Sequence, residues 1–378
     1  MTFRNTIIAA TVMVALLTFL LWNRIPGPRP IRAAGRLGIM LLGQFLAVTA
    51  LLVTLNISYG GLIVSWSDLL GRQSAAGAHM SGQAGRVALH PVAKAVSRIL
   101  TSGRQFTAAG YGGFVRTTLK GAASGVTSTV YVWLPPQYAK NPDRQYPVLE
   151  LLHGVPDSPG AWMAKMHVAE RLRAAISTGT VHPFILAIPV ITPYSNHSSP
   201  RTNEECADIS ETDRIATWLT KDVRQLVLDN FRAIDAASGW GLMGYSTGGF
   251  CAAHLLLNHP ALYRAAVSIS GYYVPESPLL THDPQLARQY DPVWLIRNTR
   301  TPAVSLLMAA SAQDRIDPPS EAQEMVAAAK AGPQSSSTEV QEYVAPLGGG
   351  HNQSAWEKML PNAFQWLSQR LSAPVSWS

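Results

Sequence analysis

Residues 241–260 read GLMGYSTGGFCAAHLLLNHP, and this stretch is the strongest indication of the fold of the chain. It starts as an apolar run typical of a strand, passes through the pentapeptide GYSTG, and continues with the apolar spacing of a helix. A serine flanked by two glycines between a strand and a helix is typical of a strained turn, which lifts the hydroxyl above a sheet and near the positive end of the helix. The context therefore predicts that Ser246 is a nucleophile.

Strands and helices alternate on both sides of this turn. The predicted strands are β-branched or apolar runs at 114–119, 130–134, 147–152, 184–190, 239–245, 265–270, 303–309 and 340–344. The predicted helices lie at 161–177, 215–231, 247–258, 320–331 and 354–371. This alternation predicts an α/β fold with a mostly parallel sheet and helices on both faces. The first two strands have no helix between them, so we expect them to form an antiparallel hairpin at the edge of the sheet.

The base for a serine nucleophile is best supplied by a histidine that follows it in the chain. A serine hydroxyl is a poor nucleophile until a base takes its proton. His351 follows three glycines, 348–350, and lies between the last predicted strand and the last predicted helix. Glycines there allow a short loop to carry the imidazole over Ser246. A surface histidine without catalytic function is the alternative interpretation.

Three carboxylates are candidates for the acid that orients this histidine. Asp314 lies five residues beyond the predicted strand 303–309, where an orienting carboxylate is expected, and it is preferred. Asp317 is the alternative acid, although its position before two prolines also fits a turn or a helix start. Glu321 is the third candidate.

An oxyanion formed during acyl transfer is usually held by two backbone N–H groups. The first predicted donor is Thr247, directly after the nucleophile. The second is Val155, in the glycine turn His153-Gly154-Val155 that follows a predicted strand. A plain strand-ending turn is compatible with the same residues, and the His153 side chain is expected to be structural.

The first 60 residues differ from the rest of the chain. They hold five of its arginines and no Lys, Asp or Glu, and so account for five of its seven excess positive charges. Residues 6–22 and 37–55 are uncharged and long enough to cross a bilayer as helices. Four arginines lie in the connector, which places it in the cytoplasm. We predict a transmembrane hairpin over 1–60, with both termini and the catalytic domain outside the plasma membrane, a linker at 61–112 and a catalytic domain at 113–378. A cleaved signal peptide is the alternative for 6–22.

The two cysteines, Cys206 and Cys251, fit this location. An even number of cysteines outside the cytoplasm predicts one disulfide, with two buried free thiols as the alternative. Such a bond would fix the polar loop before residue 215 beside the helix that follows Ser246.

The sequence lacks the patterns typical of proteins that bind nucleic acid, metals or phosphate-containing cofactors. No basic stripe with interleaved aromatic residues is present, so nucleic acid is not an expected partner. Clustered metal-ligand spacings and glycine loops for phosphate are also missing, so we expect no metal and no cofactor.

Three stretches resemble the putative esterases, a family of the α/β-hydrolase superfamily that includes esterase D, feruloyl esterases and the secreted mycolyltransferases. They are LELLHGVPDSPGAW (149–162), GYSTGGFCAAHLLLNHP (244–260) and GGGHNQSAWEKMLPNAFQWL (348–367). The resemblance implies an α/β-hydrolase fold, triad roles for Ser246, Asp314 and His351, and oxyanion roles for Val155 and Thr247. The chain departs from the mycolyltransferases, which carry an arginine after the oxyanion glycine and use a glutamate as the triad acid.

Together these features predict acyl transfer from an ester, through an acyl-enzyme, to water or another alcohol. A small-molecule, lipid or sugar ester is the expected substrate, and Trp162, Tyr245 and Tyr272 are candidates to line its site, with aromatic packing as the alternative. The preferred function is a membrane-anchored esterase, and the first alternative is an envelope acyltransferase. A peptidase and a non-catalytic surface protein are the remaining alternatives.

Overall fold

The computed structural model describes residues 26–58, 105–193, 203–333, 337–346 and 349–376. The chain divides into two compact units, Met1–Leu70 and Gly71–Ser378, and each is described by itself.

The described part of the first unit is one helix, α2, over Arg29–Ser58. It contains the apolar run 37–55, whose helical conformation was expected. Among the residues that the structure describes, none of the helices combines the length and apolar character needed to cross a bilayer. The other predicted span, 6–22, lies outside the described residues, as does most of the predicted linker. The predicted transmembrane hairpin is therefore not supported.

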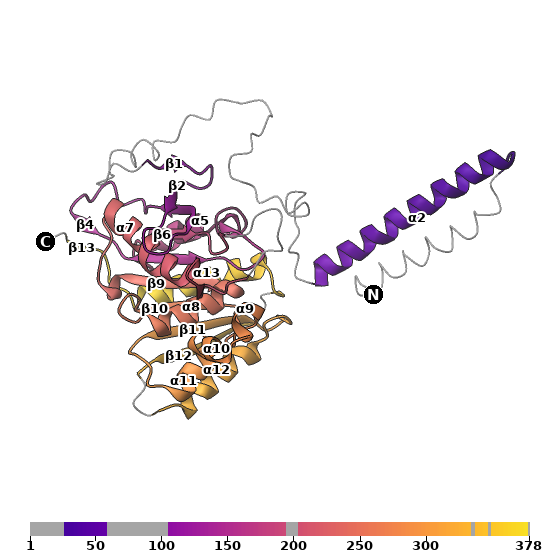
Figure 1. Ribbon diagram of the computed structural model, residues 1–378. Coiled ribbons are helices and arrows are strands. Elements are labelled where there is room, and N and C mark those ends of the chain that lie inside the picture. The colour runs from indigo at the N-terminus through magenta and orange to yellow at the C-terminus, as the bar shows by residue number, and fades with distance from the viewer. Residues whose placement is uncertain (1–25, 59–104, 194–202, 334–336, 347–348, 377–378) are drawn as a thin grey trace. The chain divides into compact units, whose positions relative to one another are not determined.

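The second unit is built on a nine-stranded sheet with the order β1-β2-β3-β6-β5-β9-β10-β11-β12 (Figure 1). The strands are β1 (Thr107–Ala108), β2 (Val115–Lys120), β3 (Thr127–Trp133), β5 (Val148–Leu152), β6 (Ile185–Pro189), β9 (Trp240–Tyr245), β10 (Ala265–Ile269), β11 (Ser305–Ser311) and β12 (Glu339–Ala345). Strands β6, β5, β9, β10, β11 and β12 pair in parallel, whereas β1, β2 and β3 pair antiparallel. The mostly parallel α/β sheet is confirmed, and each predicted strand overlaps a strand of it.

The antiparallel edge begins earlier in the chain than expected. The β2–β3 hairpin forms as predicted, but β1 pairs outside β2. Strand β1 lies within the predicted linker 61–112, and its pairing with β2 joins residues 107–108 to the sheet.

Two apolar clusters cover opposite faces of the sheet, and β5 shows why. Its side chains alternate between them, with Val148 and Leu152 in one cluster and Leu149 and Leu151 in the other, all fully buried. Apart from Glu150, β5 is an apolar run buried on both faces, as expected in the middle of a parallel sheet.

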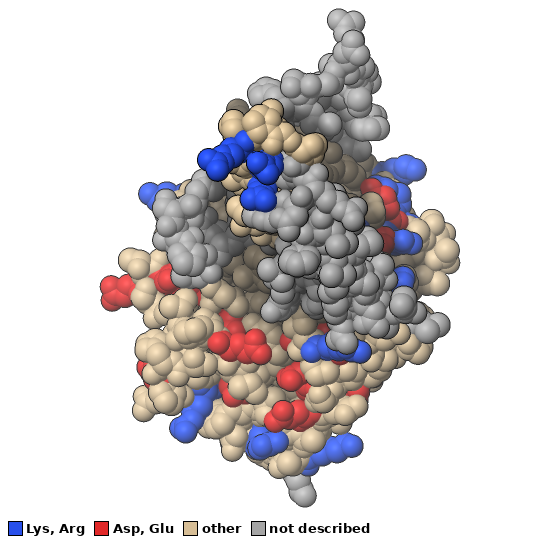
Figure 2. All heavy atoms as spheres, turned by 90° about the vertical axis from the view of Figure 1, so that its right-hand side faces the viewer, with Lys and Arg blue, Asp and Glu red and all other residues tan. Residues whose placement is uncertain are grey.

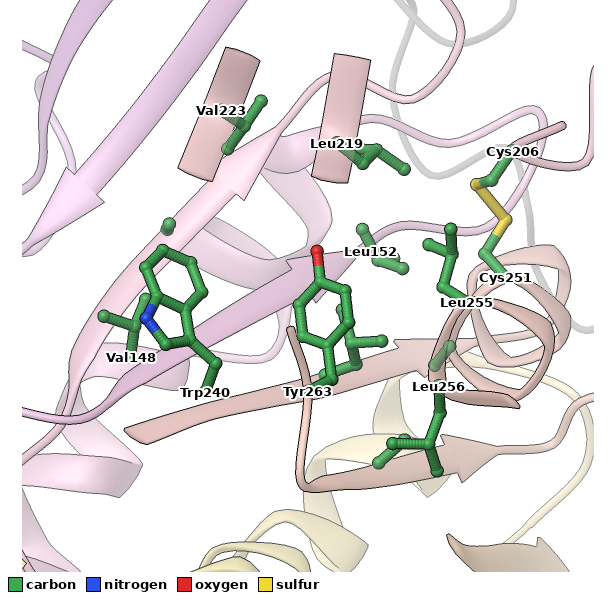
Figure 3. Close-up of a cluster of buried hydrophobic side chains, with 14 of the residues drawn as sticks. Val148, Leu152, Cys206, Leu219, Val223, Trp240, Cys251, Leu255, Leu256 and Tyr263 are labelled. Atoms are coloured by element: carbon green, nitrogen blue, oxygen red, sulfur yellow. A yellow bond between two sulfur atoms is a disulfide. The ribbon is translucent and has the colours of Figure 1, made fainter. Parts of the chain in front are cut away.

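Helices supply the other half of each cluster. On the Leu149 side are η1 (Ala161–Lys165), α5 (Val168–Ser177) and α13 (Gln353–Ser368). On the Val148 side are α6 (Ile215–Thr217), η2 (Trp218–Val223), α7 (Arg224–Asn230), α8 (Thr247–Asn258), α11 (Pro292–Asn298) and α12 (Pro319–Ala331). Figure 3 shows part of this second cluster, with side chains of β5 and β9 beside those of η2 and α8.

Sequence reasoning missed three short helices between β10 and β11. They are α9 (Pro278–Thr281), α10 (Pro284–Gln289) and α11. Each starts with a proline, directly after Ser277, Asp283 or Asp291, whose side chain caps the helix. A capping residue followed by proline is a helix-start signal, so the sequence did contain the means to find them.

The order of the sheet brings the candidate site residues together. Strands β5, β9, β10, β11 and β12 are neighbours and run parallel, so the loops after them meet at one edge. These loops carry Gly154, Ser246, Tyr272, Asp314 and His351.

Candidate active site

Ser246 occupies a strained turn between β9 and α8. Its backbone has φ 54° and ψ −127°, a conformation that residues with a side chain rarely adopt. The turn is tight enough that a Cβ on Gly244 would lie 1.8 Å from the carbonyl oxygen of Gly248. The glycines of the pentapeptide are thus required by close backbone approach, as the sequence predicted.

His351 reaches Ser246 from the loop between β12 and α13. Its Nε2 lies 2.9 Å from Ser246 Oγ, and the imidazole is buried. The Ser311 hydroxyl donates to the Gly349 carbonyl oxygen and so ties this loop to the end of β11. The indole of Trp356 packs perpendicular to the imidazole, with ring centroids 4.9 Å apart.

Asp314 lies on the other side of the imidazole. Its Oδ2 is 3.0 Å from His351 Nδ1, and its Oδ1 accepts the backbone N–H groups of Ile316 and Asp317 at 3.0 and 3.1 Å. A carboxylate at Nδ1 assigns the proton to that nitrogen, which leaves Nε2 free to accept from the Ser246 hydroxyl. Burial raises the pKa of Asp314, but the hydrogen bond and charge of His351 outweigh it and hold the pKa below its ordinary value.

Asp317, the alternative acid, is also close to the imidazole. Its Oδ2 lies 3.8 Å from His351 Nδ1, beyond hydrogen-bond distance. Burial raises the pKa of Asp317 to about 7, and the charge of Asp314 adds to the rise. The structure therefore brings Asp314 into hydrogen-bond contact with His351 and keeps Asp317 as a second carboxyl group behind it.

The candidate oxyanion donors flank Ser246. A Cβ on Gly154 would lie 3.1 Å from Ser246 Cβ and 2.9 Å from Tyr245 Cε2, so the turn that precedes Val155 packs directly against Ser246. Thr247 is the first residue of α8, where backbone N–H groups are not used within the helix and the helix dipole is positive. Both predicted donors thus belong to segments in contact with Ser246. The His153 side chain is fully buried, in agreement with a structural role.

Two of the three predicted lining residues are packed beneath the site instead. Trp162 and Tyr245 have 0% and 1% of their surface exposed. The Tyr245 ring stacks on Trp356 with centroids 4.4 Å apart, and Trp162 packs edge-on against Tyr245. In this arrangement neither ring offers an exposed surface to a substrate, and the prediction that they line the site is corrected: they support the loop that carries His351.

A polar contact that the sequence did not reveal completes this support. Asp157 Oδ2 accepts the Tyr245 hydroxyl at 3.1 Å and the Gln353 side-chain amide at 2.8 Å. The loop after β5 is thereby joined to the strand before Ser246 and to the first turn of α13.

The third predicted lining residue, Tyr272, is also buried. Its ring stacks on Phe250 of α8, and its hydroxyl donates to Glu205 Oε1 at 2.7 Å. Glu205 was missed because it lies in a polar loop without periodicity or motif. The neighbouring Cys206 was the one sign that this loop is fixed in place.

Cys206 and Cys251 form a disulfide, as predicted. It joins the loop before α6 to the second turn of α8 (Figure 3). The loop that contains Cys206 is thus covalently held to the helix that begins at Thr247.

Charged and metal-ligating side chains among the described residues bear on the binding of nucleic acid and metal. Over the lower part of the face in Figure 2, Lys and Arg side chains lie in small separate groups among Asp and Glu. Within the described ranges, no group of three or more His, Cys, Asp or Glu side chains could hold a metal ion.

Comparison with known proteins agrees with this geometry. The sequence model of the putative esterase family matches residues 122–367. An uncharacterized protein of Corynebacterium glutamicum is 25% identical over 272 residues, which cover 68% of this chain and 62% of that protein. The chain therefore matches less than two thirds of that relative's length.

Solved structures share the fold. A ferulic acid esterase has a TM-score of 0.57 at 18% identity, with 68% of this chain and 98% of that chain covered. The S-formylglutathione hydrolase of Agrobacterium tumefaciens has a TM-score of 0.56 at 15% identity, with 71% and 99% covered. Both likenesses concern the α/β-hydrolase fold of the second unit. From the match over residues 122–367, the chain belongs to the putative esterase family.

Proposed function

We propose that the chain is a serine hydrolase that cleaves carboxylic esters through an acyl-enzyme intermediate. The observation that carries this proposal is the hydrogen-bonded series Ser246–His351–Asp314, with 2.9 and 3.0 Å between successive side chains. The strained backbone of Ser246 supports it, because strain of this kind is concentrated at functional sites. Membership of an esterase family favours an ester over an amide as substrate.

In the first step, His351 Nε2 takes the hydroxyl proton as Ser246 Oγ attacks the ester carbonyl carbon. The new C–O bond converts the carbonyl oxygen to an oxyanion, for which the amides of Val155 and Thr247 are the proposed donors. Asp314 stabilises the imidazolium that forms, without taking its proton. Collapse of the tetrahedral species breaks the bond to the alcohol, which leaves with the proton from His351.

In the second step, water attacks the acyl-enzyme. His351 takes a proton from the water, the same donors hold the second oxyanion, and the bond to Ser246 Oγ breaks. The carboxylic acid is released and Ser246 recovers its proton. An added alcohol that replaces water in this step would give a new ester, which is the acyltransferase alternative.

We further propose that the catalytic unit works outside the cytoplasm. The support is the Cys206–Cys251 disulfide, since disulfides persist in oxidising compartments and are rare in the cytosol. Accessibility of the folded protein to an external protease in intact cells tests this location. Complete protection, with loss of protection only on lysis, would contradict it.

The test of the function is hydrolysis of p-nitrophenyl esters of increasing acyl length by the full chain, beside Ser246→Ala. We expect turnover by the wild type and a loss of about 10⁴-fold or more in the variant. Equal rates for the two proteins would contradict the proposal. Added alcohols are then screened for ester products, which would favour the acyltransferase alternative.

A further inference from the structure

A buried carboxylate outside the triad is linked through Tyr272 to Thr247, a proposed oxyanion donor. Glu205 is 1% exposed, and its Oε1 accepts three hydrogen bonds. The donors are the Tyr272 hydroxyl at 2.7 Å and the backbone N–H groups of Glu276 and Ser277 at 3.0 and 3.1 Å. One oxygen atom thus fixes both Tyr272 and the loop that follows it.

Tyr272 extends this contact to Thr247. Its ring stacks on Phe250 with centroids 5.0 Å apart, and its hydroxyl lies 3.4 Å from Thr247 Oγ1. A hydroxyl has one proton, and the shorter contact to the Glu205 carboxylate takes it. The Tyr272 oxygen is then an acceptor for the Thr247 hydroxyl, so the series runs from Thr247 through Tyr272 to Glu205. A hydrogen-bonded series that ends on a carboxylate is polarised along its length.

The backbone around Glu205 is fastened to α8. Cys206 is bonded to Cys251, and the Glu205 carbonyl oxygen lies 2.9 Å from His254 Nε2. Glu205 and Cys206 have φ values of 48° and 55°, a conformation unusual for residues with side chains. The carboxylate is therefore held in a fixed position relative to the helix that Thr247 begins.

This arrangement is unfavourable for stability alone. Among the described residues, Glu205 Oε2 has no hydrogen-bond partner, although it is buried. Burial also raises the pKa of the Glu205 carboxyl group. Buried polar atoms that lack partners destabilise a fold and are kept most often where a function requires them.

We infer that Glu205 and Tyr272 are positioning residues for the oxyanion side of the site, which act through Thr247. The inference rests on the proposed function, because it gives a role to the proposed donor at Thr247. The Thr247 hydroxyl, held by Tyr272, fixes the first residue of α8, and with it the direction of the N–H group beside Ser246. Small displacements of such a donor lower the rate of the chemical step more than they change substrate binding.

A second buried Glu–Tyr pair provides a matched control. Tyr263 donates to Glu150 Oε2 at 2.9 Å, and both residues are fully buried in the core (Figure 3 shows Tyr263). Tyr263→Phe removes the same hydroxyl from the same kind of pair as Tyr272→Phe does. A loss of activity through general destabilisation should therefore affect both variants.

The experiment compares Glu205→Ala, Glu205→Gln, Tyr272→Phe and Tyr263→Phe with the wild type in the full chain. We expect Tyr272→Phe and Glu205→Ala to lower kcat by about 10-fold while KM changes by less than about twofold. Glu205→Gln should stay within about threefold of the wild-type kcat, because a carbonyl oxygen can still accept the three hydrogen bonds. Tyr263→Phe should lower Tm and leave kcat unchanged.

Two outcomes would overturn the inference: a wild-type kcat in Tyr272→Phe, or an equal loss of kcat in Tyr263→Phe. Failure of the proposed function is separate, since it appears as a wild type that is no more active on esters than Ser246→Ala. In that case the rate at which Ser246 reacts with a fluorophosphonate probe is compared across the same variants. Equal rates in wild type and Tyr272→Phe would again overturn the positioning role.

Discussion

The base side and the oxyanion side of Ser246 are built on different principles. On the base side, two short hydrogen bonds between side chains link Ser246 to His351 and His351 to Asp314. On the oxyanion side, Ser246 is flanked by backbone, and side chains such as Tyr272 act one residue further away. The base side therefore depends on which side chains are present, whereas the oxyanion side depends on where the backbone is held.

The base side also contains a contrast of its own. Asp314 and Asp317 are three residues apart and face the same imidazole, yet their pKa values shift in opposite directions. Burial raises the pKa of both carboxyl groups, but Asp314 gains the hydrogen bond from His351 and Asp317 does not. The direct hydrogen bond to His351 therefore keeps the pKa of Asp314 below that of Asp317.

The largest expected effect comes from removing the charge of Asp314. Asp314→Asn should lower kcat by about 10³- to 10⁴-fold, because the amide no longer fixes the tautomer of His351 or stabilises its charged form. Ester hydrolysis kinetics measure the loss, with Ser246→Ala as the baseline. A loss below about 10-fold in this variant, together with a large loss in Asp317→Asn, would assign the triad role to Asp317.

A methyl group on Gly154 should displace the proposed oxyanion donor at Val155. Gly154→Ala places a Cβ 2.9 Å from the Tyr245 ring and 3.1 Å from Ser246 Cβ, so the turn that carries Val155 must move. We expect kcat to fall by about 100-fold, the lower end of the loss seen when one oxyanion donor is removed. Gly160→Ala in the same loop is the control, because the added Cβ would lie 3.4 Å from its nearest neighbour, Ser158 Oγ. Equal activity of both variants would show that the turn does not position a donor.

Removal of the disulfide should weaken the oxyanion side and the fold together. Cys206→Ala/Cys251→Ala opens a cross-link over 45 residues, and we expect the free energy of unfolding to fall by about 2–4 kcal/mol. Since the bond holds Glu205 beside α8, kcat should also fall by about 10-fold. Urea unfolding and ester kinetics measure the two effects. An unchanged kcat in a destabilised variant would show that the disulfide stabilises the fold but does not position the site.

The smallest expected effect concerns Asp317 and depends on pH. Its pKa of about 7 means that the group is mostly neutral at pH 6 and mostly charged at pH 8. The charged form, 3.8 Å from His351 Nδ1, favours the imidazolium formed during the reaction. Asp317→Asn should therefore match the wild-type kcat at pH 6 and fall about two- to fivefold below it at pH 8. A deficit that is equal at both pH values would indicate a structural effect of the substitution.

Most of the sheet was predictable because local pattern and tertiary environment agree. Strands such as β5 are apolar except at Glu150, and the central strands of a parallel sheet are buried on both faces. The short helices after Ser277, Asp283 and Asp291 carried start signals that were overlooked. Strand β1 could not have been found, since two exposed residues have no pattern of their own and form a strand only by pairing with β2.

Some residues of the site could likewise be predicted from local sequence, and others could not. Ser246 and His351 stand in motifs whose spacing is set by the loops that carry them, so their approach could be predicted. Trp162 and Tyr245 were expected to face the substrate, because aromatic side chains near a site look alike in sequence whether they pack beneath it or line it. Glu205 had no signal, since its partners are 67 to 72 residues away in the chain.

The sequence alone predicted the α/β class, the strained turn at Ser246 and a histidine loop able to approach it, and its two cysteines allowed one disulfide. These features depend on local backbone chemistry, on spacing and on a count of two thiols. Only the tertiary structure decided that Asp314 and not Asp317 lies within hydrogen-bond distance of His351, and that Glu205 meets Tyr272 beside Thr247. Such choices depend on differences of about 1 Å between groups brought together from separate strands, and hydrogen bonds change steeply over that distance.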